Sequence, residues 1–351
     1  MKNLATKLLL LILALALVIV PLASCADTDT APDDGQTPPT SSAPDAEDAL
    51  KPDTELEIKI YLLNGTTALG ASKLIVDAKD GKDAMNYKIE TFPAADAITG
   101  AIVSGECAIA ALPTNAAANL YKKSEGKIQL LAINTLGVLY LLSKGEDVTD
   151  LNSLKGKTIY LPGAGSNPEF ITAALIKASG LADGDVTLDT TTYPSPDALA
   201  TAVTAGEAKL AVLPEPKVTA VTSANTDVKV AINFTEEWEK IYGENTMAQG
   251  CLVVNTKFAK EHPAEISKFL DDYKASVEFI AGASDDAINT IVSAGIIPKA
   301  PVAKKALPNC NICFIEGADM KSAISVFYEK LYESNNKSIA AIPDDGFYYS
   351  R

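Results

Sequence analysis

Apolar runs that alternate with helical patterns fill the chain from about residue 56 onward. The expected strands are Glu57–Leu63, Tyr87–Thr91 and Ala108–Leu112, and the expected helices between them are Gly70–Ala78 and Ala95–Val103. The order strand, helix, strand predicts right-handed crossovers between parallel neighbours. The pattern therefore predicts an α/β protein in which helices flank a mainly parallel sheet.

A second copy of part of this pattern follows at a constant spacing of 101 residues. The segments Phe92–Pro113 and Tyr193–Pro214 share Pro, Asp, Ala, Gly, Glu and Leu in register and without a gap. Ile60–Leu62 is echoed by Ile159–Leu161 at a slightly different offset. Chance similarity between two Ala-rich stretches is the alternative, but the length of the match favours two copies of one β-α-β-α-β unit.

The ends of the duplicated elements follow from local chemistry. In each copy the Asp of a Pro-x-x-Asp segment lies in the first helical turn, where it complements the helix dipole. Gly105 and Gly206 end these helices, and Pro113 and Pro214 end the strands that follow. Because ligands bind beyond the carboxyl ends of parallel strands, four loops are candidates for a binding site. They follow Leu63, Leu112, Leu161 and Leu213.

These loops offer short hydrogen-bonding side chains and glycines, each placed before a helical pattern. Helix N-termini carry unpaired N–H groups, so they favour anionic or electron-rich ligand atoms. The glycines at 163 and 165 let the backbone approach a ligand closely, but the P-loop and dinucleotide-binding motifs are incomplete here. The candidate ligand-binding residues in the first three loops are Asn64, Gly65, Thr66, Thr67, Thr114, Asn115, Gly163, Gly165, Ser166 and Asn167.

Glu215 is the charged residue of the fourth loop, where it stands between two prolines. Two interpretations of its carboxylate remain open. It belongs to the start of the next helix, where Glu is common, or it accepts a hydrogen bond from an amine or N–H group of a ligand. We therefore include Glu215 among the candidate ligand-binding residues.

Charge and composition narrow the possible partners. The formal net charge of −15 argues against a nucleic-acid partner, because phosphate binding requires a basic surface. Arg351 is the one arginine, so a ligand anion must be held by backbone N–H groups, hydroxyls, amides or Lys. His262 is the one histidine and precedes Pro263 at an expected helix start, which excludes most His-based zinc sites. We expect no catalytic residues, metal or cofactor.

Cys310 and Cys313 have the C-x-x-C spacing of redox and metal motifs. The sequence has no second pair and no suitable histidine, which argues against zinc. A thioredoxin-like role needs the motif at a helix start after a strand. We interpret the two cysteines as buried or incidental thiols.

Residues 1–25 predict a lipoprotein signal peptide. Two lysines precede the apolar run Leu8–Val20, which is shorter than the roughly 20 residues that a spanning helix needs. The Leu-Ala-Ser-Cys that ends at Cys25 resembles the bacterial lipobox, whose cysteine is diacylated after cleavage. Two acyl chains hold a protein on a membrane. An ordinary signal peptide with a chance cysteine is the alternative.

Residues 26–55 are dominated by Pro, Ser, Thr and Asp and have almost nothing to bury. This composition predicts a disordered linker. No later segment reaches spanning length without charged residues. We therefore expect an extracytoplasmic protein that is lipid-anchored to the outer face of the cell membrane and does not span it.

Together, the lipobox, the acidic linker, the paired α/β units and the Gly-Glu-x-x-φ-Ala-x-Leu-Pro motif resemble bacterial ABC transporter substrate-binding proteins. The similarity is to the nitrate/sulfonate/taurine and thiamine-pyrimidine-precursor group. Asn255–Phe258 and His262–Glu265, followed by an expected helix to about Ile280, are also similar to that group. The resemblance covers residues 56 to about 345, and no single motif in it is diagnostic.

This resemblance implies a two-lobed, periplasmic-binding-protein-like (type II) fold with a ligand between the lobes. It divides the chain into lobe 1 (56–140), lobe 2 (141–250) and a return to lobe 1 with C-terminal helices (251–351). The crossings would lie near Leu136–Ser143 and Gly250–Asn255, which adds Gly137 to the candidate ligand-binding residues. The implied function is capture of a small solute by a monomer and delivery to an ABC permease with its ATPase.

The nature of the ligand stays open at this point. The lack of Arg inside the fold argues against α-amino acids, whose carboxylate related proteins commonly bind through Arg. A sulfonate, nitrate or taurine-like anion held by backbone and hydroxyl donors remains, as does a small heterocycle that uses Glu215. An enzyme or a ligand-sensing receptor module on the same fold is the alternative function, although the loops contain no Ser-His-Asp set.

Overall fold

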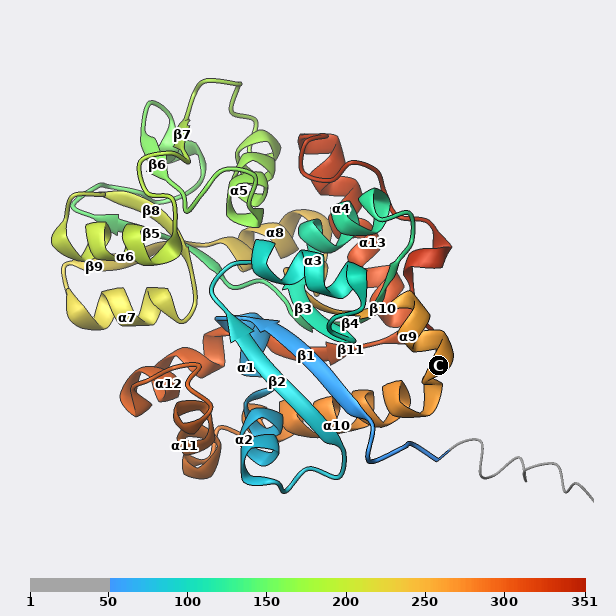
Figure 1. Cartoon of the computed structure of the whole chain (residues 1–351). Coiled ribbons are helices and arrows are strands. Elements are labelled where there is room, and N and C mark those ends of the chain that lie inside the picture. Colours follow the sequence, from blue (N-terminus) through green and yellow to red (C-terminus); the bar gives the residue numbers. More distant parts are fainter. Residues whose placement is uncertain (1–50) are drawn as a thin grey trace, which may run out of the picture. The chain divides into compact units, whose positions relative to one another are not determined.

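The computed structural model describes residues 51–351. The predicted signal peptide, Cys25 and linker residues 26–50 lie outside the described residues. Residues 51–351 belong to one compact unit, which contains two sheets flanked by helices (Figure 1). Within this described range, no helix is both long enough and apolar enough to cross a membrane.

The first sheet has six strands in the described chain. They are β1 (Glu57–Leu63), β2 (Asn86–Phe92), β3 (Ile109–Pro113), β4 (Ile128–Thr135), β10 (Gly250–Asn255) and β11 (Ile312–Ile315). Their order is β11–β4–β10–β3–β1–β2. The accompanying helices are α1 (Thr66–Leu69), α2 (Ser72–Asp80), α3 (Asp96–Ser104), α4 (Thr114–Lys123), α9 (Thr256–Glu261), α10 (Pro263–Ala281), α11 (Asp285–Ser293), α12 (Ala300–Ala306) and α13 (Gly317–Ser334). We call this part the six-stranded lobe.

The second sheet has five strands in the same range. They are β5 (Leu139–Lys144), β6 (Thr158–Tyr160), β7 (Thr187–Asp189), β8 (Leu210–Pro214) and β9 (Val228–Asn233). Their order is β7–β6–β8–β5–β9. The helices are α5 (Asn167–Ala178), α6 (Pro196–Ala205), α7 (Lys217–Ala224) and α8 (Phe234–Tyr242). We call this part the five-stranded lobe.

The two sheets share one topology. β1 pairs in parallel with β2 and β3, and β6 pairs in parallel with β7 and β8. β10 and β5 take equivalent places beside β3 and β8, and both run antiparallel to them. Each of these two strands follows directly after the chain has crossed from the other lobe. The predicted two-lobed α/β fold is therefore confirmed, with mixed sheets because the crossing strands enter from the opposite direction.

The 101-residue spacing of the sequence repeat is preserved in the structure. β3 and β8 have the same length and end at Pro113 and Pro214. The preceding helices, α3 and α6, both end at a glycine in the left-handed conformation, with φ of 82° at Gly105 and 84° at Gly206. Residues with a side chain rarely adopt this φ, which explains why glycine occupies both positions.

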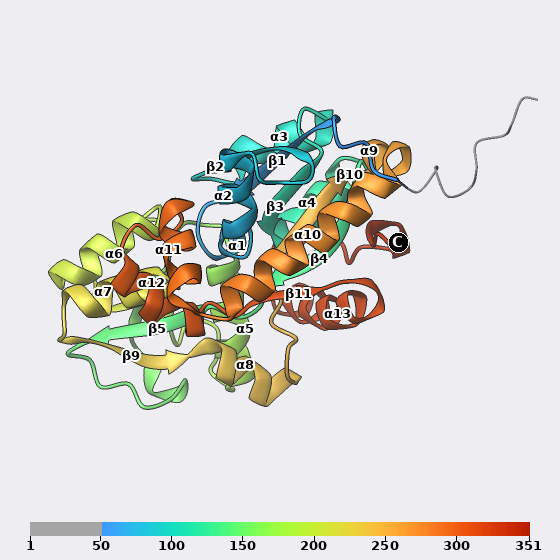
Figure 2. The same cartoon turned by 90° about the horizontal axis from the view of Figure 1, so that it is seen from below.

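Apolar packing joins the lobes on the side of α13. One hydrophobic cluster contains Phe170 of α5 and Trp238 of α8 together with Phe327 and Tyr328 of α13. The ring centroids of Trp238 and Phe327 are 5.3 Å apart. Elsewhere, α12 of the six-stranded lobe lies beside α7 of the five-stranded lobe (Figure 2). The lobes therefore contact each other on both sides of the chain crossings.

Candidate functional site

The proline ends of β3 and β8 lie against the two chain crossings. The first crossing is formed by residues 136–138 and the second by residues 243–249. Pro113 pairs with Gly250, at the end of the second crossing, and Pro214 pairs with Leu139, at the end of the first. The matched strand ends of the two lobes therefore point toward one place. We call residues 136–138 and 248–250, with the loops that contact them, the crossing junction.

Gln249 is the most highly connected residue of the crossing junction. Its backbone N–H donates to Thr135 O at 3.0 Å, and its carbonyl oxygen accepts from Thr114 N at 3.1 Å and from Asn167 Nδ2 at 3.2 Å. Its side-chain Oε1 accepts from Val138 N at 2.6 Å. One buried residue thus binds both crossings, the loop after β3 and the start of α5.

The loop after β1 joins the junction through the end of β4. Asn134 Nδ2 donates to Thr67 O at 2.9 Å, and Thr135 Oγ1 donates to Thr66 O at 3.4 Å. A Cβ at Gly250 would lie 2.7 Å from Asn134 Oδ1 and from Thr67 Cγ2. Real Cβ atoms do not approach other atoms so closely, so the contact between this loop and the second crossing requires glycine.

The loop after β6 contacts the six-stranded lobe directly. Asn115 Nδ2 donates to Gly165 O at 3.4 Å across the two lobes. Within the loop, Ser166 Oγ donates to Gly163 O at 2.9 Å, and the two glycines have φ of 80° and 75°. Their positive φ explains why this turn needs glycines. The loops after β3 and β6 are therefore in contact in this structure.

The candidate ligand-binding residues separate into a buried group and an exposed group. The buried group, at the crossing junction, comprises Thr66, Thr67, Thr114, Asn115, Gly137 and Asn167. Gly65, Gly163 and Ser166 are partly exposed, and Asn64 and Gly165 are exposed. The N–H of Asn64 donates to Phe92 O at 2.8 Å, which fixes this residue beside the end of β2.

Glu215 is buried and has its own partners within α7. Its carboxylate accepts from Thr219 N at 3.0 Å and from Thr219 Oγ1 at 2.8 Å. Burial raises the pKa of Glu215, although the hydrogen bonds from Thr219 act in the opposite direction. The N–H of Glu215 donates to Val138 O at 3.0 Å. Of the two interpretations from the sequence, these contacts favour a role at the start of the helix.

Gly137 lies where α8 packs on the first crossing. A Cβ there would be 2.2 Å from Thr235 Oγ1 and 2.9 Å from Met247 Sδ. A third segment of the chain also binds the first crossing. Asn311 Nδ2 donates to Gly137 O, and Asn311 O accepts from Leu136 N at 3.0 Å. Gly137 therefore permits close packing of three segments around the crossing.

Asn311 stands inside the C-x-x-C motif, whose cysteines are both free thiols. Cys310 Sγ donates to Ala306 O at 3.2 Å, and Cys313 Sγ donates to Ile133 O at 3.6 Å. Burial raises the pKa of Cys310 and raises that of Cys313 to about 12, so the reactive thiolate is scarce at neutral pH. Within residues 51–351, no group of three or more His, Cys, Asp and Glu could hold a metal ion.

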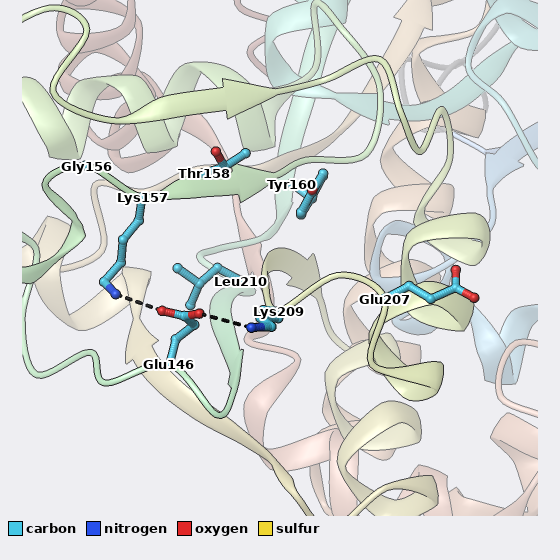
Figure 3. Close-up of a pocket in the computed structure, with 8 residues that line it drawn as sticks. All are labelled: Glu146, Gly156, Lys157, Thr158, Tyr160, Glu207, Lys209 and Leu210. Carbon is cyan, nitrogen blue, oxygen red and sulfur yellow. Dashed lines mark hydrogen bonds and ion pairs between the residues drawn. The ribbon is translucent and has the colours of Figure 1, made fainter.

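One cavity lies away from the crossing junction. Its volume is about 500 Å³, and Figure 3 shows Glu146 between the ammonium groups of Lys157 and Lys209. The N···O distances from Glu146 are 2.9 Å to Lys157 and 3.7 Å to Lys209, and the two lysines lower the pKa of this carboxyl. Thr158 and Leu210 begin β6 and β8, so this cavity lies at the amino ends of strands whose carboxyl ends reach the junction.

Several residues of the crossing junction are not among the candidate residues that the sequence predicted. Gln249 and Asn311 carry no local signal, because their partners lie 82 or more positions away. Thr235 carries none because its contact is with the backbone of a glycine. Asn134 and Thr135 do carry one: a buried polar pair ends an otherwise apolar run. Buried polar groups are normally hydrogen-bonded, so such a pair marks a junction.

Comparison with known proteins identifies a family region. Residues 127–287 match the family model described as NMT1/THI5 like. This region begins just before β4, contains both crossings and ends within α11. No curated protein sequence matches the chain.

Solved structures share the fold over most of the chain. An ABC transporter structure from Parabacteroides distasonis superposes with a TM-score of 0.70 at 21% identity, over 85% of this chain and 100% of that one. The periplasmic aliphatic sulphonate binding protein SsuA from Escherichia coli gives 0.67 at 14% identity, over 84% and 92%. The alkanesulfonate-binding protein SsuA from Xanthomonas axonopodis pv. citri, bound to MOPS, gives 0.63 at 14%, over 83% and 96%.

These matches agree with the two-lobed fold described above. A protein from Candida albicans described as having the generic periplasmic binding protein fold also superposes, with a TM-score of 0.59. The resemblance expected from the sequence is thus confirmed. The chain contains an NMT1/THI5-like region and has the periplasmic-binding-protein fold shared by SsuA proteins and other ABC transporter structures.

Proposed function

We propose that this protein is the solute-binding component of an ABC importer. The observation that carries the proposal is the crossing junction, where the matched loops of two duplicated lobes meet at two short chain crossings. Such an arrangement suits closure of two lobes around a ligand, because a few residues at the crossings absorb the motion. The fold shared with SsuA proteins supports the same function.

The proposed ligand is a sulfonate, nitrate or taurine-like anion, with a small heterocycle as the second class. The similar SsuA structures are described as binding aliphatic sulphonates or alkanesulfonates. Among the described residues, no side chain caps α4 at Pro113 or α5 at Ser166. The Thr114 N–H of α4 already donates to Gln249 O, so the electron-rich atoms of a ligand would use the remaining N–H groups of these helix starts. Proposed contacts are Asn64, Gly65, Thr66, Thr67, Thr114, Asn115, Gly163, Gly165, Ser166 and Asn167. Gly137 and Glu215 would shape the junction behind them.

Binding without turnover is part of the proposal. The test is native mass spectrometry and thermal-shift measurement on the purified protein with alkanesulfonates, nitrate and aminopyrimidines. We expect one solute bound per chain, a higher melting temperature and recovery of the unchanged solute after long incubation. Conversion of a bound solute to a product would favour an enzyme and overturn the proposal. Failure of all these solutes to bind would overturn the proposed ligand classes.

We also propose that Cys25 carries the lipid anchor, which places a monomeric binding protein on the extracytoplasmic face beside its permease. The support is the signal-peptide pattern and the acidic linker of the sequence. Expression in bacteria with a radiolabelled fatty acid tests this placement. The wild-type protein should incorporate label and sediment with membranes, and C25A should do neither. Equal labelling of both forms would rule out the anchor.

A further inference from the structure

An unpaired polar atom stands out in the crossing junction. Among residues 51–351, three buried side-chain atoms have no hydrogen-bond partner: Asn167 Oδ1, Thr235 Oγ1 and Ser338 Oγ. Thr235 Oγ1 packs against the backbone of Gly137. Ser338 lies beyond α13, where its carbonyl accepts from Asn119. Asn167 is the one of the three in a loop proposed to contact a ligand.

The orientation of the Asn167 amide is fixed by its neighbour. Nδ2 donates to the backbone carbonyl of Gln249 at 3.2 Å. Exchange of the amide nitrogen and oxygen would place two acceptors against each other, so the oxygen is the unpaired atom. Asn167 is 5% exposed, so bulk water does not satisfy this oxygen. The side chain is thus held as a buried acceptor at the first residue of α5.

We propose that Asn167 is a specificity-determining residue, and that its Oδ1 accepts a hydrogen bond from an N–H or O–H group of the bound solute. The inference rests on the proposed function and restricts the class of possible ligands. The solute carries a hydrogen-bond donor as well as an electron-rich group for the helix starts. A solute without the donor leaves a buried acceptor unpaired, and sites built in this way discriminate strongly against such analogues.

Gln249 makes this selection depend on the junction. Its carbonyl oxygen accepts from Thr114 N of the six-stranded lobe and from Asn167 Nδ2 of the five-stranded lobe. The Asn167 oxygen is therefore oriented only while the five-stranded lobe lies against the second crossing. Donor recognition and contact between the lobes are coupled through one carbonyl group.

Matched pairs of solutes test the inference by isothermal titration calorimetry. The pairs are 2-hydroxyethanesulfonate with 1-propanesulfonate, and 4-aminopyrimidine with 4-methylpyrimidine, so that each pair has equal charge and differs in the donor group. We expect the wild-type protein to bind the donor-bearing member of a pair about tenfold more tightly or better, since one hydrogen bond to a buried acceptor is sufficient for that factor. In N167L the preference should fall to about threefold or less.

Two further variants guard against a merely structural effect. T172V alters a buried hydroxyl of the same helix, bonded to Pro168 O at 2.6 Å, and should keep the preference. N167A removes the same oxygen with a smaller side chain and should also lose the preference, which leaves the inference testable if N167L fails to fold. Equal binding of both members by the wild type, or a preference that survives in N167L, overturns the inference while supporting solute binding. Binding of none of the four solutes counts against both.

Discussion

The side-chain oxygen of Gln249 accepts a 2.6 Å hydrogen bond from the backbone N–H of Val138. This bond joins the two chain crossings directly, although the two residues are 111 positions apart. Because Val138 O also accepts from Glu215 N, the bond connects the loop after β8 to the residue that orients Asn167. The geometry of the crossing junction therefore depends on the buried side chain of Gln249.

Removal of this oxygen should destabilise the protein measurably. Q249L leaves the buried N–H of Val138 without a partner, and we expect the free energy of unfolding to fall by about 1–3 kcal/mol. Urea denaturation followed by circular dichroism measures the change. Q129L is the matched control, because Gln129 is half-buried and donates to Gly346 O on the surface. A control effect as large as that of Q249L would contradict a special role for Gln249.

A methyl group at Gly137 should be tolerated poorly. G137A places a Cβ 2.2 Å from Thr235 Oγ1, so the crossing or α8 must move, and we expect a loss of about 1–3 kcal/mol in the free energy of unfolding. G137A combined with T235A should recover part of this loss. G100A is the control, since a Cβ there meets nothing within 4 Å in α3, and it should stabilise slightly. Absence of recovery in the double variant would refute the proposed clash.

The duplicated helix ends should respond alike to substitution. G105A and G206A each force alanine into a left-handed conformation, so each should lower the free energy of unfolding by about 1 kcal/mol. The Lys144 side chain also lies over Gly206 and must move, which adds a small further cost there. Thermal unfolding of both variants measures the comparison. A neutral effect at either glycine would argue against its role in ending the helix.

The contribution of Glu215 to the free energy of unfolding should fall as the pH rises. Burial raises the pKa of this carboxyl in the folded state above the usual 4.5, so the folded protein binds more protons than the unfolded chain between the two values. The contribution of Glu215 to stability is therefore full at low pH and is lost as the pH rises through the folded pKa. The stability of E215Q relative to wild type should increase from pH 4 to pH 7.

Urea denaturation of wild type and E215Q at both pH values measures this difference. Variant T219V should enlarge the pH dependence of the wild-type carboxyl, because hydrogen bonds from Thr219 oppose the effect of burial. A relative stability of E215Q that decreases with pH would show that these hydrogen bonds outweigh burial.

The cysteines of the described chain should react slowly in the folded state. Burial raises the pKa of Cys107 and of Cys313 to about 12 and also raises those of Cys251 and Cys310. Labelling with a thiol reagent at pH 8 should be much slower in the native protein than in denaturant. Mass spectrometry follows the labelling. Rapid native labelling of Cys310 and Cys313, or an intact mass two hydrogens lower, would instead indicate a redox-active motif.

Local chemistry allowed much of the fold to be predicted from the sequence. Glycine at positions 105 and 206 and proline at positions 113 and 214 mark the ends of helices and strands, and the structure ends α3, α6, β3 and β8 at those residues. The repeat also indicates the topology, since two copies of one unit imply two sheets with a similar strand order. The helix start at His262 was predictable for the same reason, because Pro263 suits a first turn.

The crossing junction was harder to predict because its contacts are distant in sequence. The expected crossings, Leu136–Ser143 and Gly250–Asn255, include β5 and β10, whereas the chain changes lobes at 136–138 and 243–249. The first crossing, Leu-Gly-Val, is apolar like the strand that follows it, whereas the second begins with exposed polar residues that resemble an ordinary loop. Asn311 contacts a residue 174 positions away, and no local pattern signals such a partner. Glu215 remained ambiguous since a carboxylate between prolines suits both a helix start and a ligand.

The placement of β5 and β10 has a consequence for folding of the chain during its synthesis. All strands of the five-stranded sheet lie between Leu139 and Asn233, whereas the six-stranded sheet needs β10, which occupies its interior between β3 and β4. A chain that emerges N-terminus first completes its second lobe before its first. The early strands β1 to β4 must wait, incompletely paired, until residue 255 has emerged, so the first lobe is exposed to misfolding for longest.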